Sequence, residues 1–182
     1  GVIIKLTDNF AAISATGEEI LAQAGASLAA VSNAAWKAGL SGLEFASGIP
    51  GTIGGAVAMN AGAYDGEMKD LVIKTTSMDE NCGIIQLYGE QHEFGYRKSV
   101  IQRNRLMVLE ATMKLQKGDP DVIKEKMQCL NARRREKQPL NLPSAGSVFK
   151  RPPDHFAGKL IEEAGLRGFH IGICSSGTPI AL

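Results

Sequence analysis

The chain has 182 residues, of which 44% are hydrophobic and 21% are charged, and its formal net charge is +1 at pH 7. These values are typical of a globular protein with one domain, or with one domain and part of a second, and they argue against a disordered chain. The small net charge and an aromatic content of 5% also argue against a nucleic-acid-binding surface.

Cysteine and histidine are few and scattered. Cys82, Cys129 and Cys174 form no C-x-x-C pair, which indicates free thiols in a reducing compartment, and the dispersed histidines give no metal-ligand pattern. No apolar run reaches the roughly 18 residues that a membrane span needs, and the first residues do not form a signal peptide. We therefore expect a cytoplasmic protein with no metal and no membrane insertion. The chain opens without Met and closes without a capping element, so we expect both ends to be truncations.

The first third of the chain predicts short strands followed by helices. Residues 2–6 and 10–15 have the composition of strands around a turn, and residues 18–24 alternate as a third strand. Ser27 predicts the N-cap of a helix that ends before Gly39. A short second helix is expected to begin near residue 51 and to run past residue 57.

The rest of the chain also predicts strands together with helices. Residues 71–78, 84–87 and 106–115 predict strands, and Pro120 predicts the first turn of a helix that breaks near residue 138. Asp154 predicts the N-cap of a last helix that runs to residue 164. Because neighbouring strands follow one another like a meander, the pattern favours an α+β fold over a βαβ series.

A glycine-rich stretch is the most unusual part of the sequence. Residues 47–64 contain five glycines and no formal charge. Glycine loses much freedom on folding, so such a run predicts a backbone that must approach something closely. One interpretation is a ligand with phosphates or a flat ring, held by bare amides, and the other is a tight buried turn. The spacing matches neither the Rossmann fingerprint nor the P-loop.

Two further segments contain residues suited to chemistry, namely residues 95–99 and 143–150. By themselves they are weak signals, because a Tyr-Arg pair is more often a surface stack and a serine in a Pro/Gly loop is more often a cap. Ser147 has no G-x-S-x-G frame and no nearby histidine, so a hydrolase nucleophile is not predicted.

In their order and spacing, these three segments resemble the UDP-N-acetylenolpyruvoylglucosamine reductases, a flavoenzyme family of peptidoglycan precursor synthesis. The resemblance covers residues 1 to about 171, and the absence of a long insertion after residue 104 is similar to the family's shorter form. It implies an α+β fold with an FAD-binding module of the vanillyl-alcohol-oxidase (PCMH) type over residues 1–137. Residues 138–182 would form part of an α+β substrate-binding domain.

The resemblance also implies a reaction and its residues. FAD, bound non-covalently, would take hydride from NADPH and reduce UDP-N-acetylglucosamine enolpyruvate to UDP-N-acetylmuramate. Arg97 would stabilise the enolate-like charge and Ser147 would protonate it, while Tyr96 and Lys150 would bind the substrate, Lys150 through a phosphate. The implied cofactor-binding residues are Gly48, Ile49, Pro50, Gly51, Thr52, Gly54, Gly55, Asn60, Gly62 and Ala63.

The sequence departs from the family pattern in two main places. The family's first flavin loop precedes the strand that corresponds to residues 2–4, and its catalytic glutamate lies beyond a C-terminal segment that residues 173–182 do not match. Arg151 also stands where the family usually has Asn. One interpretation is part of a working reductase, and the alternative is an inactive fragment that retains at most flavin or sugar-nucleotide binding. We expect this chain alone to turn over poorly, and the sequence leaves its oligomeric state open.

Overall fold

The computed structural model describes residues 6, 8–64, 66–138, 149, 152, 154–171 and 174–175. The chain divides into two compact units, Gly1–Leu130 and Asn131–Leu182. The division falls inside helix α4 (Pro120–Lys137), close to the predicted domain boundary at residue 137. Apart from Leu6, the predicted first strand lies outside the described residues.

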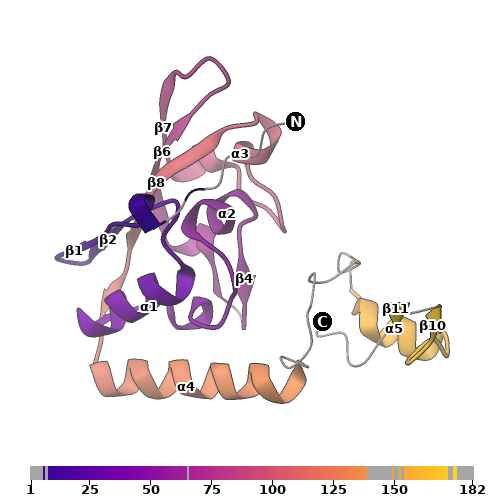
Figure 1. Cartoon of the computed structure of the whole chain (residues 1–182). Coiled ribbons are helices and arrows are strands. Elements are labelled where there is room, and N and C mark those ends of the chain that lie inside the picture. Colours follow the sequence, from indigo (N-terminus) through magenta and orange to yellow (C-terminus); the bar gives the residue numbers. More distant parts are fainter. Residues whose placement is uncertain are drawn as a thin grey trace. The chain divides into compact units, whose positions relative to one another are not determined.

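Unit 1 is built on a five-stranded antiparallel sheet with the order β1-β2-β8-β6-β7 (Figure 1). Its strands are β1 (Ile13–Thr16), β2 (Glu19–Gln23), β6 (Val72–Met78), β7 (Ile84–Tyr88) and β8 (Met107–Lys114). The hairpins β1–β2 and β6–β7 are joined by β8, which pairs with β2 on one side and with β6 on the other. These antiparallel pairings, together with the helices, confirm the predicted α+β class.

A β-bulge keeps one face of the sheet buried. The buried side chains of β8 are Val108, Ala111 and Met113, so their spacing changes from three residues to two. The register between β6 and β8 shifts at the same place, between Thr76 and Ser77, and leaves one extra residue in β8. Strict alternation would turn part of the strand's apolar set to the other face, and the bulge prevents this.

Helix α1 (Leu28–Lys37) begins and ends where the sequence predicts. The Ser27 hydroxyl accepts a hydrogen bond from the amide of Ala30 at 3.1 Å, as an N-cap does. Gly39, with φ +66°, follows the last turn in the left-handed conformation that glycine adopts readily.

Helix α2 (Ile53–Ala58) is the predicted short helix of the glycine-rich stretch, and it packs on β8 and β2. Both helices share one hydrophobic core with the sheet. Its helix and sheet members include Leu28, Val31, Ala35, Ile53, Ala56, Val57, Ile20, Ala22, Ala111 and Met113. The backbone of the glycine-rich stretch is therefore anchored on the core of unit 1.

Several short elements complete unit 1. They are η1 (Asp8–Phe10), β3 (Leu40–Ser41), η2 (Glu44–Ala46), β4 (Gly62–Ala63), β5 (Gly66–Glu67), η3 (Met68–Asp70), η4 (Gly89–His92), α3 (Val100–Arg103) and β9 (Gln116–Lys117). The predicted strand over residues 10–15 is wrong in its first part, because the sheet pairing begins only at Ile13. The side-chain Oε1 of Gln23 accepts a hydrogen bond from the amide of Ala12 at 2.9 Å, in the place where a paired strand would offer a backbone carbonyl.

Helix α4 begins at Pro120, as predicted. Two polar contacts hold its first part, which belongs to unit 1, to the rest of that unit. The indole Nε1 of Trp36 donates to the carbonyl of Pro120 at 2.9 Å. The ammonium of Lys126 lies 3.4 Å from a carboxylate oxygen of Glu44. These contacts join α4 to α1 and to the segment before the glycine-rich stretch.

Unit 2 contains helix α5 (Ala157–Glu163) and a small antiparallel pair, β10 (His170–Ile171) with β11 (Cys174–Ser175). The predicted end of α5 is confirmed, since Gly165 has φ +69° and its amide donates to the carbonyl of Glu162. The predicted start is wrong. Asp154 lies in a turn with φ +59°, and the N-cap position is Phe156, whose side chain makes no capping hydrogen bond.

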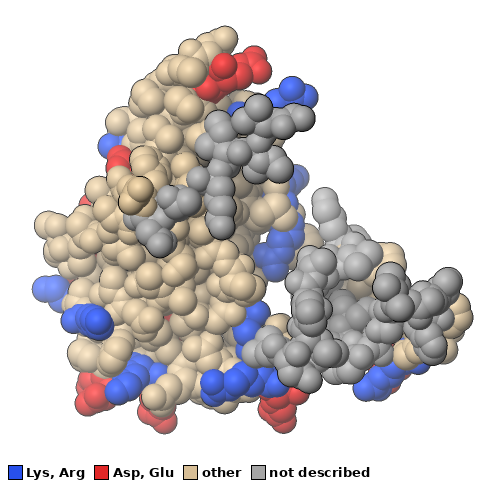
Figure 2. All heavy atoms as spheres, viewed as in Figure 1, with Lys and Arg blue, Asp and Glu red and all other residues tan. Residues whose placement is uncertain are grey.

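The face of unit 1 drawn in Figure 2 carries Lys and Arg side chains beside Asp and Glu side chains, separated by wide uncharged areas. In the part of the chain that the structure describes, no helix is long and apolar enough to cross a membrane. The described residues also contain no group of three or more His, Cys, Asp or Glu side chains that could hold a metal ion.

Candidate functional site

The glycine-rich stretch leads from η2 through an exposed turn into α2 and then into β4 (Figure 1). Two hydrogen bonds fix the turn and the first residues of α2 on the end of β2. The amide of Ile53 donates to the carbonyl of Ala26 and the amide of Gly54 donates to the carbonyl of Ala24, both at 2.9 Å. The segment is thus held in a fixed position at the end of β2, a strand in the interior of the sheet.

The glycines of this stretch have two different surroundings. A Cβ on Gly54 would lie 3.0 Å from the Cβ of Ala24, and one on Gly62 would lie 2.7 Å from the carbonyl oxygen of Gly66. At Gly51 a Cβ would meet nothing within 4 Å, and at Gly55 it would meet only the hydroxyl of Thr52, at 4.0 Å. Packing within the chain therefore explains Gly54 and Gly62, and the φ of +155° explains Gly51, whereas neither explains Gly55.

The exposed turn also presents amides that the fold does not use. Gly51, Thr52 and Gly55 are exposed, and their amides donate to no backbone carbonyl among the described residues. Bare amides without neighbouring side chains can donate to an anionic ligand. One part of this stretch is therefore a packed turn, while the other part is exposed, and ligand binding by the exposed part stays a prediction.

The predicted catalytic arginine lies on a tight turn after η4. The amide of Gly95 donates to the carbonyl of Lys98 at 3.0 Å, and the amide of Lys98 donates back to Gly95 at 3.2 Å. Arg97 has φ +54°, a conformation that residues with a side chain rarely adopt. The Arg97 guanidinium lies 5.4 Å from the ring centroid of Tyr96, whose side chain is half exposed.

Arg97 reaches back to the end of the glycine-rich stretch. Its Nη2 donates to the carbonyl of Gly62 at 3.0 Å and its Nη1 donates to the carbonyl of Asn60 at 3.4 Å. The hydroxyl of Ser99 donates to the carbonyl of Ala58 at 2.7 Å and ties the same turn to the end of α2. The structure therefore brings together two segments that lie about 35 residues apart in the sequence.

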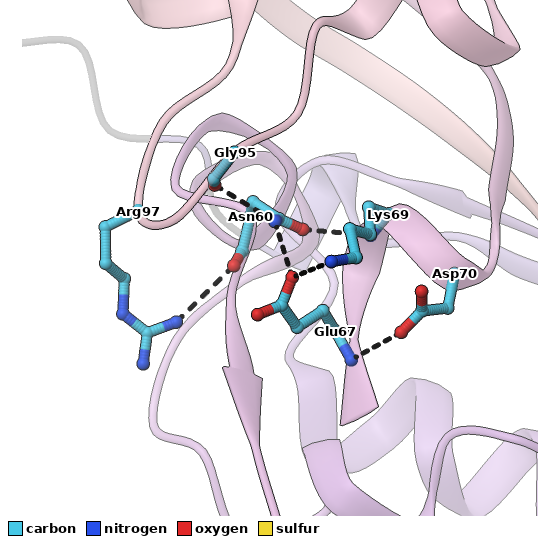
Figure 3. A network of polar contacts seen from close by, with 6 residues as sticks. All are labelled: Asn60, Glu67, Lys69, Asp70, Gly95 and Arg97. Carbon is cyan, nitrogen blue, oxygen red and sulfur yellow. Dashed lines mark hydrogen bonds and ion pairs between the residues drawn. The ribbon is translucent and has the colours of Figure 1, made fainter. Parts of the chain in front are cut away.

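Asn60 is at the centre of the polar network beside this contact (Figure 3). Its Nδ2 donates to Glu67 at 3.0 Å and to the carbonyl of Gly95 at 3.1 Å, and its Oδ1 accepts from the amide of Lys69 at 2.9 Å. The Lys69 ammonium lies 3.0 Å from Glu67, and this carboxylate raises the pKa of Lys69. Sequence reasoning missed Glu67, because a carboxylate in a short hairpin carries no signal of such a role.

The remaining predicted cofactor-binding residues line the same segment. Ile49 packs against the core, Pro50 is exposed, and Gly48 and Ala63 are partly buried. Ser147 and Lys150, the predicted proton donor and phosphate-binding residue, lie outside the described residues. The roles of all these residues stay predictions, and the structure groups the ones of unit 1 into one region.

The sequence matches two family models. Residues 1–88 match the model of an FAD binding domain, and residues 138–177 match that of the UDP-N-acetylenolpyruvoylglucosamine reductase C-terminal domain. The chain is 52% identical over 172 residues to the UDP-N-acetylenolpyruvoylglucosamine reductase of Caldanaerobacter subterraneus subsp. tengcongensis, covering 94% of this chain and 57% of the relative. It is 55% identical over 168 residues to that of Clostridioides difficile, covering 92% of this chain and 55% of the relative.

The fold has a solved counterpart. The crystal structure of UDP-N-acetylenolpyruvylglucosamine reductase (MurB) from Thermus caldophilus aligns with a TM-score of 0.82 at 32% sequence identity, over 97% of this chain and 64% of that one. The chain thus spans just over half the length of the curated relatives that it matches. By its flavin-domain match, its C-terminal-domain match and these relatives, the chain belongs to the UDP-N-acetylenolpyruvoylglucosamine reductase family.

Proposed function

We propose that this chain supplies the FAD-binding part, and some of the substrate-binding part, of an NADPH-dependent reductase. Its reaction would convert UDP-N-acetylglucosamine enolpyruvate to UDP-N-acetylmuramate during peptidoglycan precursor synthesis, in the cytoplasm. Family membership supports the proposal. The observation that carries it is the contact of Arg97 with the carbonyls of Asn60 and Gly62, since it joins the cation to the predicted flavin segment.

The exposed turn fits an extended anionic cofactor. The unused amides of Gly51, Thr52 and Gly55 can donate to phosphate oxygens, and the open space at the two glycines leaves room for close approach. When bound, FAD supplies hydride-transfer chemistry that no amino-acid side chain provides. The chain's own part is to hold and orient the cofactor at this end of β2.

Arg97 fits the role of the substrate-facing cation. Its guanidinium is planar and permanently charged, and it has five N–H donors, of which the two carbonyls engage one on each Nη. The other donors can bind a carboxylate, on which negative charge builds as the neighbouring double bond is reduced. Because two backbone carbonyls orient the group in advance, little reorganisation is needed when substrate arrives.

Three further residues complete the proposal. Ser147 would donate a proton to the carbon next to the carboxylate, Lys150 would pair with a substrate phosphate, and half-exposed Tyr96 would contact substrate beside Arg97. The assignments of Ser147 and Lys150 rest on the family resemblance. A second candidate is flavin or sugar-nucleotide binding without turnover, and the match of residues 1–88 to an FAD binding domain supports it equally.

The test is NADPH oxidation in the presence of FAD and UDP-N-acetylglucosamine enolpyruvate, measured with the full-length gene product and with the 182-residue chain. We expect substrate-dependent oxidation by the full-length protein and slow or no oxidation by the shorter chain. Arg97→Lys should lower the rate at saturating substrate by about 100-fold, because one ammonium cannot replace the planar fork. The control is Arg103→Lys, since Arg103 is exposed and paired with Glu93.

Oxidation that does not depend on the substrate, or that is equally fast in Arg97→Lys, would contradict the proposed reaction. FAD binding by the 182-residue chain without turnover would support the second candidate for this chain alone. Binding of the sugar nucleotide without any FAD binding would point to a module with no redox chemistry.

A further inference from the structure

We propose that Asn60 is a positioning residue, whose side chain holds the turn that presents Arg97. The inference deepens the proposed function and rests on it, because it gives Arg97 its place beside the flavin segment. It differs from the role that the family resemblance implies for Asn60, which is contact with the cofactor.

The side chain of Asn60 is occupied by the protein itself. Only 1% of the residue is exposed, and both N–H donors of its amide have partners, Glu67 and the carbonyl of Gly95. Its Oδ1 already accepts from the amide of Lys69. A ligand therefore finds no free donor on this side chain, and breaking one of these bonds to bind a cofactor would leave a buried polar group unpaired.

The same side chain links two separate parts of the chain, the adjoining elements β5 and η3 and the start of the Arg97 turn. Its partners lie 7, 9 and 35 residues further along the chain, on β5, on η3 and at the start of the Arg97 turn. Figure 3 shows Glu67, Lys69 and Gly95 arranged around the Asn60 amide, with Arg97 bonded to the Asn60 carbonyl. Asn60 thus contacts both ends of the arrangement, the turn through its side chain and the guanidinium through its backbone.

The backbone conformation explains why asparagine stands at this position. Asn60 has φ +42°, a left-handed conformation that asparagine adopts more readily than most residues with a Cβ. Arg97 itself has φ +54°, and such strained residues persist only where surrounding contacts over-determine them. The hydrogen bond from Asn60 to Gly95 is one of those contacts, at the first residue of the turn.

The main test follows the Arg97 side chain by NMR in protein labelled at arginine, with the Arg97 signals assigned by their loss in Arg97→Lys. Asn60→Asp keeps the size, the Oδ1 acceptor and the tolerance of the left-handed conformation, but it removes both N–H donors. The matched control is Asn33→Asp at an exposed position of α1. We expect faster solvent exchange of the Arg97 N–H groups, by tenfold or more, in Asn60→Asp alone, with FAD affinity within threefold of wild type.

A second pair of variants covers the case in which Asn60→Asp does not fold. Glu67→Met removes one acceptor of the Asn60 amide, and Lys69→Met removes only the exposed ammonium while the Lys69 amide stays bonded to Asn60. We expect Glu67→Met to speed exchange at Arg97 in the same direction, and Lys69→Met to leave it unchanged.

Unchanged Arg97 signals in a folded Asn60→Asp, or in Glu67→Met when Asn60→Asp is unfolded, would overturn the inference. Loss of FAD affinity without any change at Arg97 would instead identify Asn60 as a cofactor contact. The readout does not depend on the proposed function. If wild type binds no FAD, the proposed function fails for this chain, and the Arg97 signals still decide the role of Asn60.

Discussion

At the scale of single residues, two neighbouring glycines in α2 have opposite surroundings. A methyl group on Gly54 would lie 3.0 Å from the Cβ of Ala24, which is a tight contact, and the hydrogen bond from the Gly54 amide to the Ala24 carbonyl opposes a shift of the helix away from it. Gly55 faces open space. One glycine is thus required by packing, and the other is available for a ligand.

Replacing each of these two glycines with alanine should change the stability of the chain by different amounts. Gly54→Ala and Gly55→Ala gain the same helix propensity, so the difference in their free energies of unfolding isolates the contact with Ala24. We expect Gly54→Ala to be less stable than Gly55→Ala by about 1–3 kcal/mol, as in other overpacked cores. Urea unfolding followed by circular dichroism measures both. Equal stability of the two variants would show that the helix shifts freely on the sheet.

His92 is a buried histidine that the proposed reaction does not use. Its Nδ1 lies 2.8 Å from the carbonyl of Gly89, which can only accept, so Nδ1 carries the proton. Its Nε2 lies 3.0 Å from the hydroxyl of Thr75, and its ring stacks on Phe94 with centroids 5.0 Å apart. Burial lowers the pKa of His92, and the bond to Gly89 opposes this shift only in part.

The lowered pKa predicts a pH dependence of stability. Just below the ordinary value of 6.5, the unfolded chain binds a proton at His92 and the folded chain does not. The free energy of unfolding should therefore rise with pH up to about 6.5 and then level off. In His92→Gln this dependence should be weaker than in wild type, whereas a control at exposed His155 should keep it. Identical pH profiles of wild type and His92→Gln would refute the prediction.

At the scale of elements, Glu44 fastens helix α4 to the rest of unit 1. Its buried carboxylate accepts from the hydroxyl of Ser41 at 2.7 Å, the amide of Gly42 at 3.1 Å and the ammonium of Lys126 at 3.4 Å. Burial alone raises the pKa of Glu44, but the hydrogen bonds and the Lys126 charge together lower it. The stabilisation is therefore present above the ordinary pKa of 4.5 and is lost as the pH falls further.

Removing either partner of this contact should lower the free energy of unfolding, but by different amounts. The side chain of Lys126 is 58% exposed, so Lys126→Met should lower the free energy of unfolding by no more than about 1 kcal/mol. Glu44→Ala removes the acceptor of the Ser41 hydroxyl and the Gly42 amide, so it should lower the free energy of unfolding by about 2–3 kcal/mol. Trp36, the single tryptophan, donates to Pro120 at the start of α4, so its fluorescence reports whether the helix remains in place. Equal costs for both variants would show that the exposed ion pair carries the contact.

Elements with a strong pattern could be predicted from sequence. Ser27 and Gly39 bound α1, and the strands of the main sheet follow from their apolar and β-branched runs. Two-residue strands such as β3 and β9 were missed, because their pairing depends on contacts distant in sequence. The start of α5 was placed too early, since Asp154 has the chemistry of a cap but lies in a preceding turn.

The candidate site was predictable only in part. The glycine-rich stretch and Arg97 were found from motifs, but their contact depends on how α2 and the Arg97 turn pack on the sheet. The sequence assigned all glycines of the stretch one role, and the structure divides them between packing and open space. The roles of Glu67 and Ser99 have no sequence signal, because each is defined by a partner in another segment.

At the scale of the whole molecule, the chain matches relatives almost twice as long as the part that it covers. Unit 1 contains the core, the exposed amides and the guanidinium, and each is fixed by contacts within that unit. One wall of the proposed flavin site can therefore be tested in this chain separately from turnover, for which residues of unit 2 are also proposed.

Titration of the 182-residue chain with FAD measures whether the segment Gly51–Gly55 binds the cofactor, as proposed. Wild type should show saturable binding by flavin absorbance and fluorescence. Gly55→Leu fills the open space with a good helix former, so it should keep its melting temperature and weaken FAD binding by at least about tenfold. Ala132→Leu, at an exposed position of α4, should bind like wild type. Absence of saturable FAD binding, or equal affinity of wild type and Gly55→Leu, would contradict the claim.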